Sequence, residues 1–133
     1  MTQDVSTKIT ADKLDAMFKM QEDFMLRLRD THEAFPRSWP FDLLKKQSQL
    51  DVKECAFNSV EELFEAVKEL KNAKKHRLTD VSEFDREHFV EECVDAFKYF
   101  LELLIFVGVD ADEFFKAYSK KDVVINRRLD EGY

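Results

Sequence analysis

Glycine and proline are scarce in this sequence, with two of each among 133 residues. Hairpin and sandwich turns depend heavily on these two residues, so their scarcity indicates an all-α protein. Glycine-rich phosphate loops are also excluded, because Gly108 and Gly132 stand alone and neither GxGxxG nor GxxxxGK[ST] occurs. The shortage therefore predicts an all-α fold, which we expect to be a helical bundle of four to five helices.

Long apolar runs and an excess of basic residues are missing too. The longest uninterrupted apolar run, Leu103–Val107, is far too short to cross a bilayer, and the polar N-terminus carries no apolar signal segment. A net charge of −7 argues against nucleic acid as the main partner, because basic faces bind phosphate backbones. The two cysteines fall in expected helices and suit reduced core thiols. We expect a cytoplasmic protein with no membrane and no nucleic acid as a partner.

Apolar residues are plentiful despite these shortages. They make up 44% of the chain and include 13 phenylalanines, while charged residues make up 37%. This balance is typical of a globular chain rather than a disordered one. We expect residues 1–9, which are polar, to be disordered, and residues 10–133 to form a single all-α domain.

The apolar residues recur at helical spacing along most of the chain. We expect helices over about 10–30, 41–49, 51–72, 85–107 and 110–126. The expected N-caps are Thr10, Asp51, Ser82 or Asp80, and Asp110, and Gly108 is expected to close the fourth helix. The expected inward residues of the third helix are Val52, Ala56, Val60, Leu63, Val67 and Leu70, and those of the last helix are Phe114, Phe115, Ala117 and Tyr118.

The helix over 85–107 is apolar on nearly every side, which predicts a buried position. A charged stripe nevertheless interrupts it, at spacings of three, three and four residues, and consists of Glu92, Asp95, Lys98 and Glu102. Charges on a buried face are unfavourable unless something neutralises them. We interpret the acidic part of the stripe as ligands of a divalent metal.

A second acidic pair, Glu62 and Glu65, lies on the preceding long helix. Spacing of three places both members of each pair, Glu62-x-x-Glu65 and Glu92-x-x-Asp95, on one helix face. Two antiparallel helices can then bring four carboxylates around one to three hard cations. Carboxylates without His or Cys favour Mg²⁺, with Mn²⁺ as the alternative.

Basic residues near these helices suit the phosphates that usually complete a Mg²⁺ site. They are Lys74, Lys75, Lys121, Arg127 and Arg128. The combination suggests metal-assisted hydrolysis of a phosphoanhydride. A ferritin-like di-iron site would require Glu-x-x-His pairs, and none of the three histidines has a Glu three residues before it. No Ser-His-Asp or Cys-His arrangement is supported either.

Two polar or aromatic residues outside the acidic helices are candidates for binding a nucleobase. Gln21 is an amide on the apolar face of the first helix, where it either edges the core or faces a ligand. Trp39, between two prolines in a loop, either plugs the core or stacks on a planar ligand.

The order of these motifs resembles the all-α nucleoside triphosphate pyrophosphatases, which include MazG-like proteins and dimeric dUTPases. The resemblance is carried by AMFKMQEDFMLRL, EELFEAVKEL and EECVDAFKYFLELLIFVGVDADEFFKAYSKK, and by the ending with Arg128 and Gly132-Tyr133. In layout the phage dCTP/dUTP pyrophosphatases look most similar.

The resemblance implies roles for particular residues. Glu62, Glu65, Glu92 and Asp95 are expected to hold the metal, and Glu62 or Glu65 is expected to orient or deprotonate the attacking water. The triphosphate is expected to be held by Lys121, Asn126, Arg128 and Tyr133, with Tyr118 as a further candidate. Lys74 and Lys75 are expected to join them because of their charge, independently of the resemblance. The reaction implied is hydrolysis of a (deoxy)nucleoside triphosphate to the monophosphate and pyrophosphate, in a homodimer or homotetramer of phage or bacterial origin.

Lys98 stands where members of the family often have His or Asn. It is either a contact for the base or an internal counter-ion of Glu102. The substrate accordingly stays open between dUTP or dCTP and a purine nucleotide such as dGTP. The alternative to the enzyme is a non-catalytic helical dimerisation or regulatory module, in which the acidic stripes form salt bridges between subunits.

Overall fold

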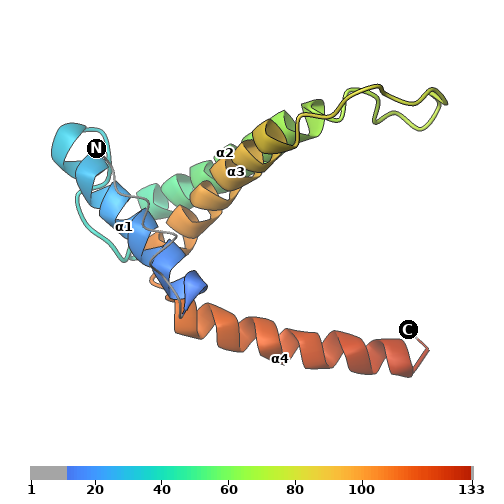
Figure 1. The fold of residues 1–133 in the computed structure, drawn as a ribbon. Coiled ribbons are helices and arrows are strands. Elements are labelled where there is room, and N and C mark those ends of the chain that lie inside the picture. Colours follow the sequence, from blue (N-terminus) through green and yellow to red (C-terminus); the bar gives the residue numbers. More distant parts are fainter. Residues whose placement is uncertain (1–11, 133) are drawn as a thin grey trace. The chain divides into compact units, whose positions relative to one another are not determined.

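The computed structural model describes residues 12–132, which contain four α-helices and no strand (Figure 1). The helices are α1 (Lys13–Thr31), α2 (Lys46–Lys68), α3 (Arg86–Phe106) and α4 (Ala111–Asp130). The prediction of an all-α fold is confirmed. The expected disordered segment 1–9 and the expected cap Thr10 lie outside the described residues. Among residues 12–132, no helix is both long enough and apolar enough to cross a membrane.

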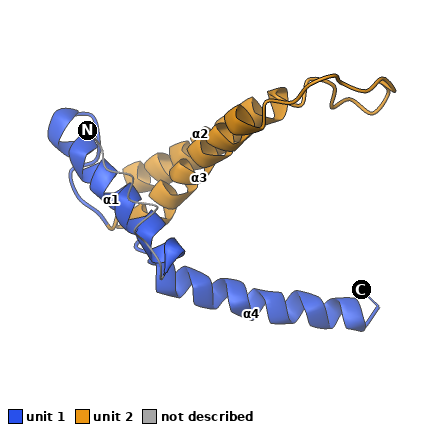
Figure 2. Ribbon diagram, viewed as in Figure 1, with its two compact units in different colours: residues 1–39, 108–133 blue, residues 40–107 orange. Residues whose placement is uncertain are grey.

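The chain divides into two compact units (Figure 2). Unit 2 covers residues 40–107 and is built on the α2–α3 pair, whereas unit 1 combines residues 1–39 with 108–133 and contains α1 and α4. Each helix pair is therefore assembled within one unit, and the two acidic motifs both belong to unit 2.

Three helices begin at aspartates whose side chains satisfy free backbone N–H groups of the first turn. Asp12 accepts from the N–H of Asp15 at 3.0 Å, Asp85 from that of His88 at 3.0 Å, and Asp110 from that of Glu113. The expected cap Asp110 is confirmed. The expected caps Ser82 and Asp80 of α3 are wrong, because Asp85 lies closer to the first helical turn.

The predicted boundary between helices 41–49 and 51–72 is wrong. Residues 46–68 form one continuous helix, and Asp51 lies inside it, where its carboxylate accepts from Gln47 Nε2 one turn earlier at 2.9 Å. No glycine or proline separates residues 41 and 51, so nothing interrupts the helical backbone. The same helix ends at Lys68 rather than at the predicted residue 72. The chain turns out of the helix there, and Lys71 adopts a left-handed conformation with φ of 62°.

The ends of α3 and α4 follow their glycines. Gly108 has φ of 83° directly after α3, as predicted for a residue that closes a helix. Gly132 has the same φ of 83°, and α4 continues to Asp130, beyond the predicted end at Asn126. No glycine or proline lies between Gly108 and Gly132, so residues 127–130 continue the helix rather than form an irregular tail.

Unit 2 is held together where α2 lies along α3 (Figure 1). Cys55 and Ala66 are buried on α2, and the buried residues of α3 are Ala96, Leu101, Glu102, Leu104, Ile105 and Phe106. The segment before α2 is fastened to the end of α3, since Phe41 stacks on Phe106 at 4.4 Å and donates its N–H to the Phe106 carbonyl at 2.8 Å.

The predicted orientation of α2 is wrong. Most of its expected inward residues are exposed in this chain, among them Val60 at 50% and Leu63 at 49%. The prediction that α3 is buried on nearly every side is also wrong for its first half, where Val90 and Val94 are exposed at 47% and 49%. The helices meet instead along a seam that carries polar side chains, because α2 presents the neighbouring strip of its surface to α3.

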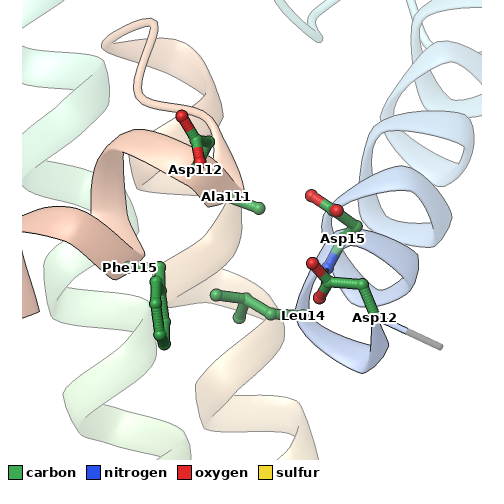
Figure 3. A pocket seen from close by; sticks show the side chains of 6 residues that line it. All are labelled: Asp12, Leu14, Asp15, Ala111, Asp112 and Phe115. Carbon is green, nitrogen blue, oxygen red and sulfur yellow. Dashed lines mark hydrogen bonds between the residues drawn. The ribbon is translucent and has the colours of Figure 1, made fainter. Parts of the chain in front are cut away.

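Unit 1 places the beginning of α1 beside the beginning of α4, where Leu14, Ala111 and Phe115 line a pocket (Figure 3). Asp12, Asp15 and Asp112 complete its lining. None of the residues predicted for the functional site lines this pocket.

The remainder of α4 differs from prediction. Phe114 is partly buried, but Phe115, Ala117 and Tyr118 are exposed rather than inward. Ala111, the first residue of α4, is the one buried residue of this helix.

Candidate metal centre

Three of the four predicted metal ligands meet across the α2–α3 seam. Glu62 on α2, and Glu92 and Asp95 on α3, each offer one carboxylate oxygen, and these three oxygens lie within 4.8 Å of one another. Glu92 and Asp95 share a face of α3 because they are three residues apart. Glu62 reaches them because its strip of α2, and not the apolar stripe, packs on α3.

Negative charges repel one another in this acidic cluster, which consists of Glu62, Glu92 and Asp95. Glu62 and Glu92 are partly buried and Asp95 is exposed. Desolvation raises the pKa of Glu62, and the negative charges of Asp95 and Glu92 raise it further. Because the carboxylates repel one another, a bound cation would stabilise the cluster.

The donor set suits a hard divalent ion. The three carboxylate oxygens of the described residues lie within 4.8 Å of one another. Oxygen ligands of this type are the ones that Mg²⁺ and Mn²⁺ prefer, and in Mg²⁺ sites water or phosphate oxygens normally fill the other positions.

Glu65, the fourth predicted ligand, lies beside the cluster but outside the group of three. Its Oε1 atom is 3.1 Å from Lys68 Nζ, one turn later on α2. Its charge nevertheless contributes to the raised pKa of Glu62. The role of Glu65 as a ligand or base stays a prediction.

Sequence reasoning missed two residues that adjoin the cluster. His88 Nε2 lies 3.2 Å from Glu92 Oε1 and 3.2 Å from Glu69 Oε1, so the imidazole connects the end of α2 with the cluster. The signal was available, because His88 and Glu92 are four residues apart on one helix face.

Beyond the cluster, the seam continues toward the end of α3 with further polar contacts. Ser59 Oγ donates to the Ala96 carbonyl at 2.8 Å, and Cys55 Sγ donates to Glu102 Oε2 at 3.4 Å in a buried position. Burial raises the pKa of Glu102, while the positive charge of Lys98 lowers it. This electrostatic attraction agrees with the interpretation of Lys98 as a counter-ion of Glu102.

The basic residues predicted to hold phosphate are distributed over both units. Lys74 and Lys75 lie in the exposed loop between α2 and α3, and Lys121 and Arg128 are exposed on α4. Asn126 Nδ2 donates to the Asp122 carbonyl one turn earlier. Tyr133 lies outside the described residues. The phosphate-binding roles of all six residues stay predictions.

The two residues predicted for the base differ in their surroundings. Gln21 is buried, at 3% exposure, and its Oε1 atom has no hydrogen-bond donor among the described residues. Trp39 donates from Nε1 to Glu22 at 3.0 Å, meets Phe35 edge-on and lies 5.8 Å from the Arg29 guanidinium. These contacts agree with Trp39 acting as a plug that fastens the loop to α1.

No family model matches this chain, and neither does any curated protein or solved structure. The acidic cluster and its neighbours are therefore the features from which a function can be inferred.

Proposed function

We propose that this protein is a Mg²⁺-dependent pyrophosphohydrolase that converts a (deoxy)nucleoside triphosphate and water into the monophosphate and pyrophosphate. The observation that supports it is the approach of Glu62, Glu92 and Asp95 from two helices to within 4.8 Å. Mn²⁺ is the alternative ion, and one to three ions per site are consistent with the four acidic residues. We also propose that it works in the cytoplasm.

The proposed chemistry uses the cluster in two ways. Bound ions lower the pKa of a coordinated water and offset charge on the phosphoryl oxygens. Glu62, Glu92 and Asp95 would hold the ions, and Glu65, which is exposed at the edge of the cluster, or Glu62 would accept the proton of the attacking water. The water oxygen forms a bond to the α-phosphorus as the bond to the bridging oxygen of pyrophosphate breaks.

The substrate contacts are proposed from residue chemistry. Lys74, Lys75, Lys121, Asn126 and Arg128 are exposed donors suited to phosphate oxygens, and Tyr133 is proposed for the same role. Gln21 is the preferred residue for the base, because a buried amide oxygen without a donor can accept a hydrogen bond from a base N–H group. Trp39 and Lys98 have partners of their own and are secondary candidates. The base stays open between pyrimidines (dUTP, dCTP) and purines such as dGTP.

A homodimer or homotetramer is part of the proposal. The outer faces of α2 and α3 expose large apolar side chains, namely Phe57, Val60, Leu63, Phe64, Val67, Val90, Val94 and Phe97. Exposed apolar surface of this extent on a small chain typically marks a protein interface. A second copy would cover these faces and leave the polar seam of each helix pair inside a larger bundle.

A non-catalytic dimerisation module is the second candidate. In this module basic side chains rather than a cation neutralise the acidic residues, as Lys68 does for Glu65 within α2 at 3.1 Å. The two proposals differ in metal dependence, because a module held by ion pairs needs no cation.

The deciding experiment measures pyrophosphate released from each dNTP in the presence of Mg²⁺. The enzyme proposal expects pyrophosphate rather than orthophosphate, and expects Glu92→Gln and Asp95→Asn to abolish release while the circular dichroism spectrum is retained. Glu87→Gln, an exposed acid on the same helix, is the matched control and should behave as wild type. Turnover by the Glu92 and Asp95 variants at the wild-type rate would make the site assignment wrong.

A further inference from the structure

We propose that His88 is a positioning residue for the metal centre: its imidazole orients the Glu92 carboxylate of the acidic cluster and links it to Glu69 at the end of α2. This inference rests on the proposed function, because it names a residue that orients one of the proposed ligands. Neither the ExxE and ExxD pattern nor the charged stripe of α3 includes His88.

The imidazole lies between carboxylates of two helices. Its Nε2 atom is 3.2 Å from Glu69 Oε1 and 3.2 Å from Glu92 Oε1, and its Nδ1 atom is 3.8 Å from Glu91 Oε2. The Glu69 and Glu92 side chains are only 22% and 18% exposed, so both are partly shielded from water. The His88 side chain is itself 46% exposed, so water reaches the imidazole while the two carboxylates are partly covered.

The backbone around His88 is fixed independently of this contact. Its N–H donates to the Asp85 side chain at the N-terminus of α3, which sets the helical turn from which the imidazole projects. Glu92 follows four residues later on the same face, and Glu69 is the C-cap residue directly after α2. His88 therefore joins the end of one helix to the first turns of the other beside the cluster.

The position of His88 suits a residue that orients the Glu92 carboxylate better than a residue that binds the metal ion directly. Among the described residues, the group of side chains close enough to share a cation comprises Glu62, Glu92 and Asp95, and does not include His88. Carboxylates can only accept hydrogen bonds, so the nitrogen that faces two of them serves as a donor. A donor on one oxygen of Glu92 leaves the other oxygen for the ion, which is how outer groups commonly orient metal ligands.

The test measures Mn²⁺ affinity without nucleotide, from the electron paramagnetic resonance signal of free Mn²⁺. His88→Ala is expected to weaken binding by roughly 10- to 100-fold, the usual cost of losing a group that orients a ligand. His88→Gln should recover much of that loss, because its side-chain amide retains an N–H donor. His76→Ala, an exposed loop histidine, is the control and should bind Mn²⁺ as wild type.

The outcomes separate this inference from the proposed function. If wild type fails to bind Mn²⁺, or if Glu92→Gln binds it equally well, the metal centre itself is refuted. If wild type binds and Glu92→Gln does not, while His88→Ala binds normally, only the role of His88 is refuted. If His88→Ala does not fold, His88→Phe decides, because it keeps a ring but has no N–H donor: weakened Mn²⁺ affinity supports the role, and wild-type affinity overturns it.

Discussion

Binding of Mg²⁺ should raise the melting temperature of this protein by an amount that follows from the size of the chain. A ligand at one hundred times its Kd adds about 2.7 kcal/mol to the free energy of unfolding. Unfolding entropy of about 2.1 cal/mol/K per residue gives about 280 cal/mol/K for 133 residues. The expected increase in Tm is therefore about 10 °C. If unit 2, which is about half of the chain, unfolds alone, the expected increase is about twice as large.

The assay is differential scanning calorimetry in EDTA and in increasing MgCl₂. NaCl at equal ionic strength is the control, because salt alone screens the repulsion among Glu62, Glu92 and Asp95. Glu92→Gln should lose most of the Mg²⁺-dependent increase, since it removes one of the three oxygens that approach within 4.8 Å. An equal increase with NaCl, or an unchanged increase in the variant, would refute the metal centre.

Three further predictions concern the seam, a helix cap and the exposed apolar face. Because burial raises the pKa of Glu102 above its usual 4.5, the folded state retains a proton that the unfolded chain releases, so the free energy of unfolding should fall as pH rises from 4.5. Urea unfolding between pH 4 and 8 should show that slope in wild type and a weaker one in Glu102→Gln; equal slopes would contradict the assignment. Asp85→Ala should cost about 0.5–2 kcal/mol by removing the cap of α3, measured by urea unfolding, with Asp85→Asn retaining most of the stability. Phe57→Glu and Phe64→Glu should dissociate the proposed oligomer in light scattering, and an unchanged mass would place the interface elsewhere.

The local features of this protein were largely determined by its sequence. The scarcity of glycine and proline predicted helices throughout, Asp110 marked the beginning of α4, and Gly108 marked the end of α3. The spacing of three that puts Glu92 and Asp95 on one face is also a local property, because it depends only on helical periodicity.

The rotation of α2 about its own axis was decided only by the tertiary structure. Its apolar stripe, including Val60 and Leu63, was predicted to face the core, yet these side chains are exposed and Glu62 faces α3 instead. An amphipathic pattern shows that one face needs a partner. It does not show whether that partner is another helix of the same chain or a surface outside it.

The contact of His88 with Glu69 depends on tertiary structure for a related reason. The two residues lie on different helices, so no periodicity within either helix brings them together, and only the packing of α2 on α3 places both beside Glu92. The sequence by itself predicted four acidic metal ligands from their helical spacing. The tertiary structure decided which face of α2 packs against α3 and so brings Glu62 to Glu92 and Asp95. That choice depends on how the complete surfaces of the two helices fit together.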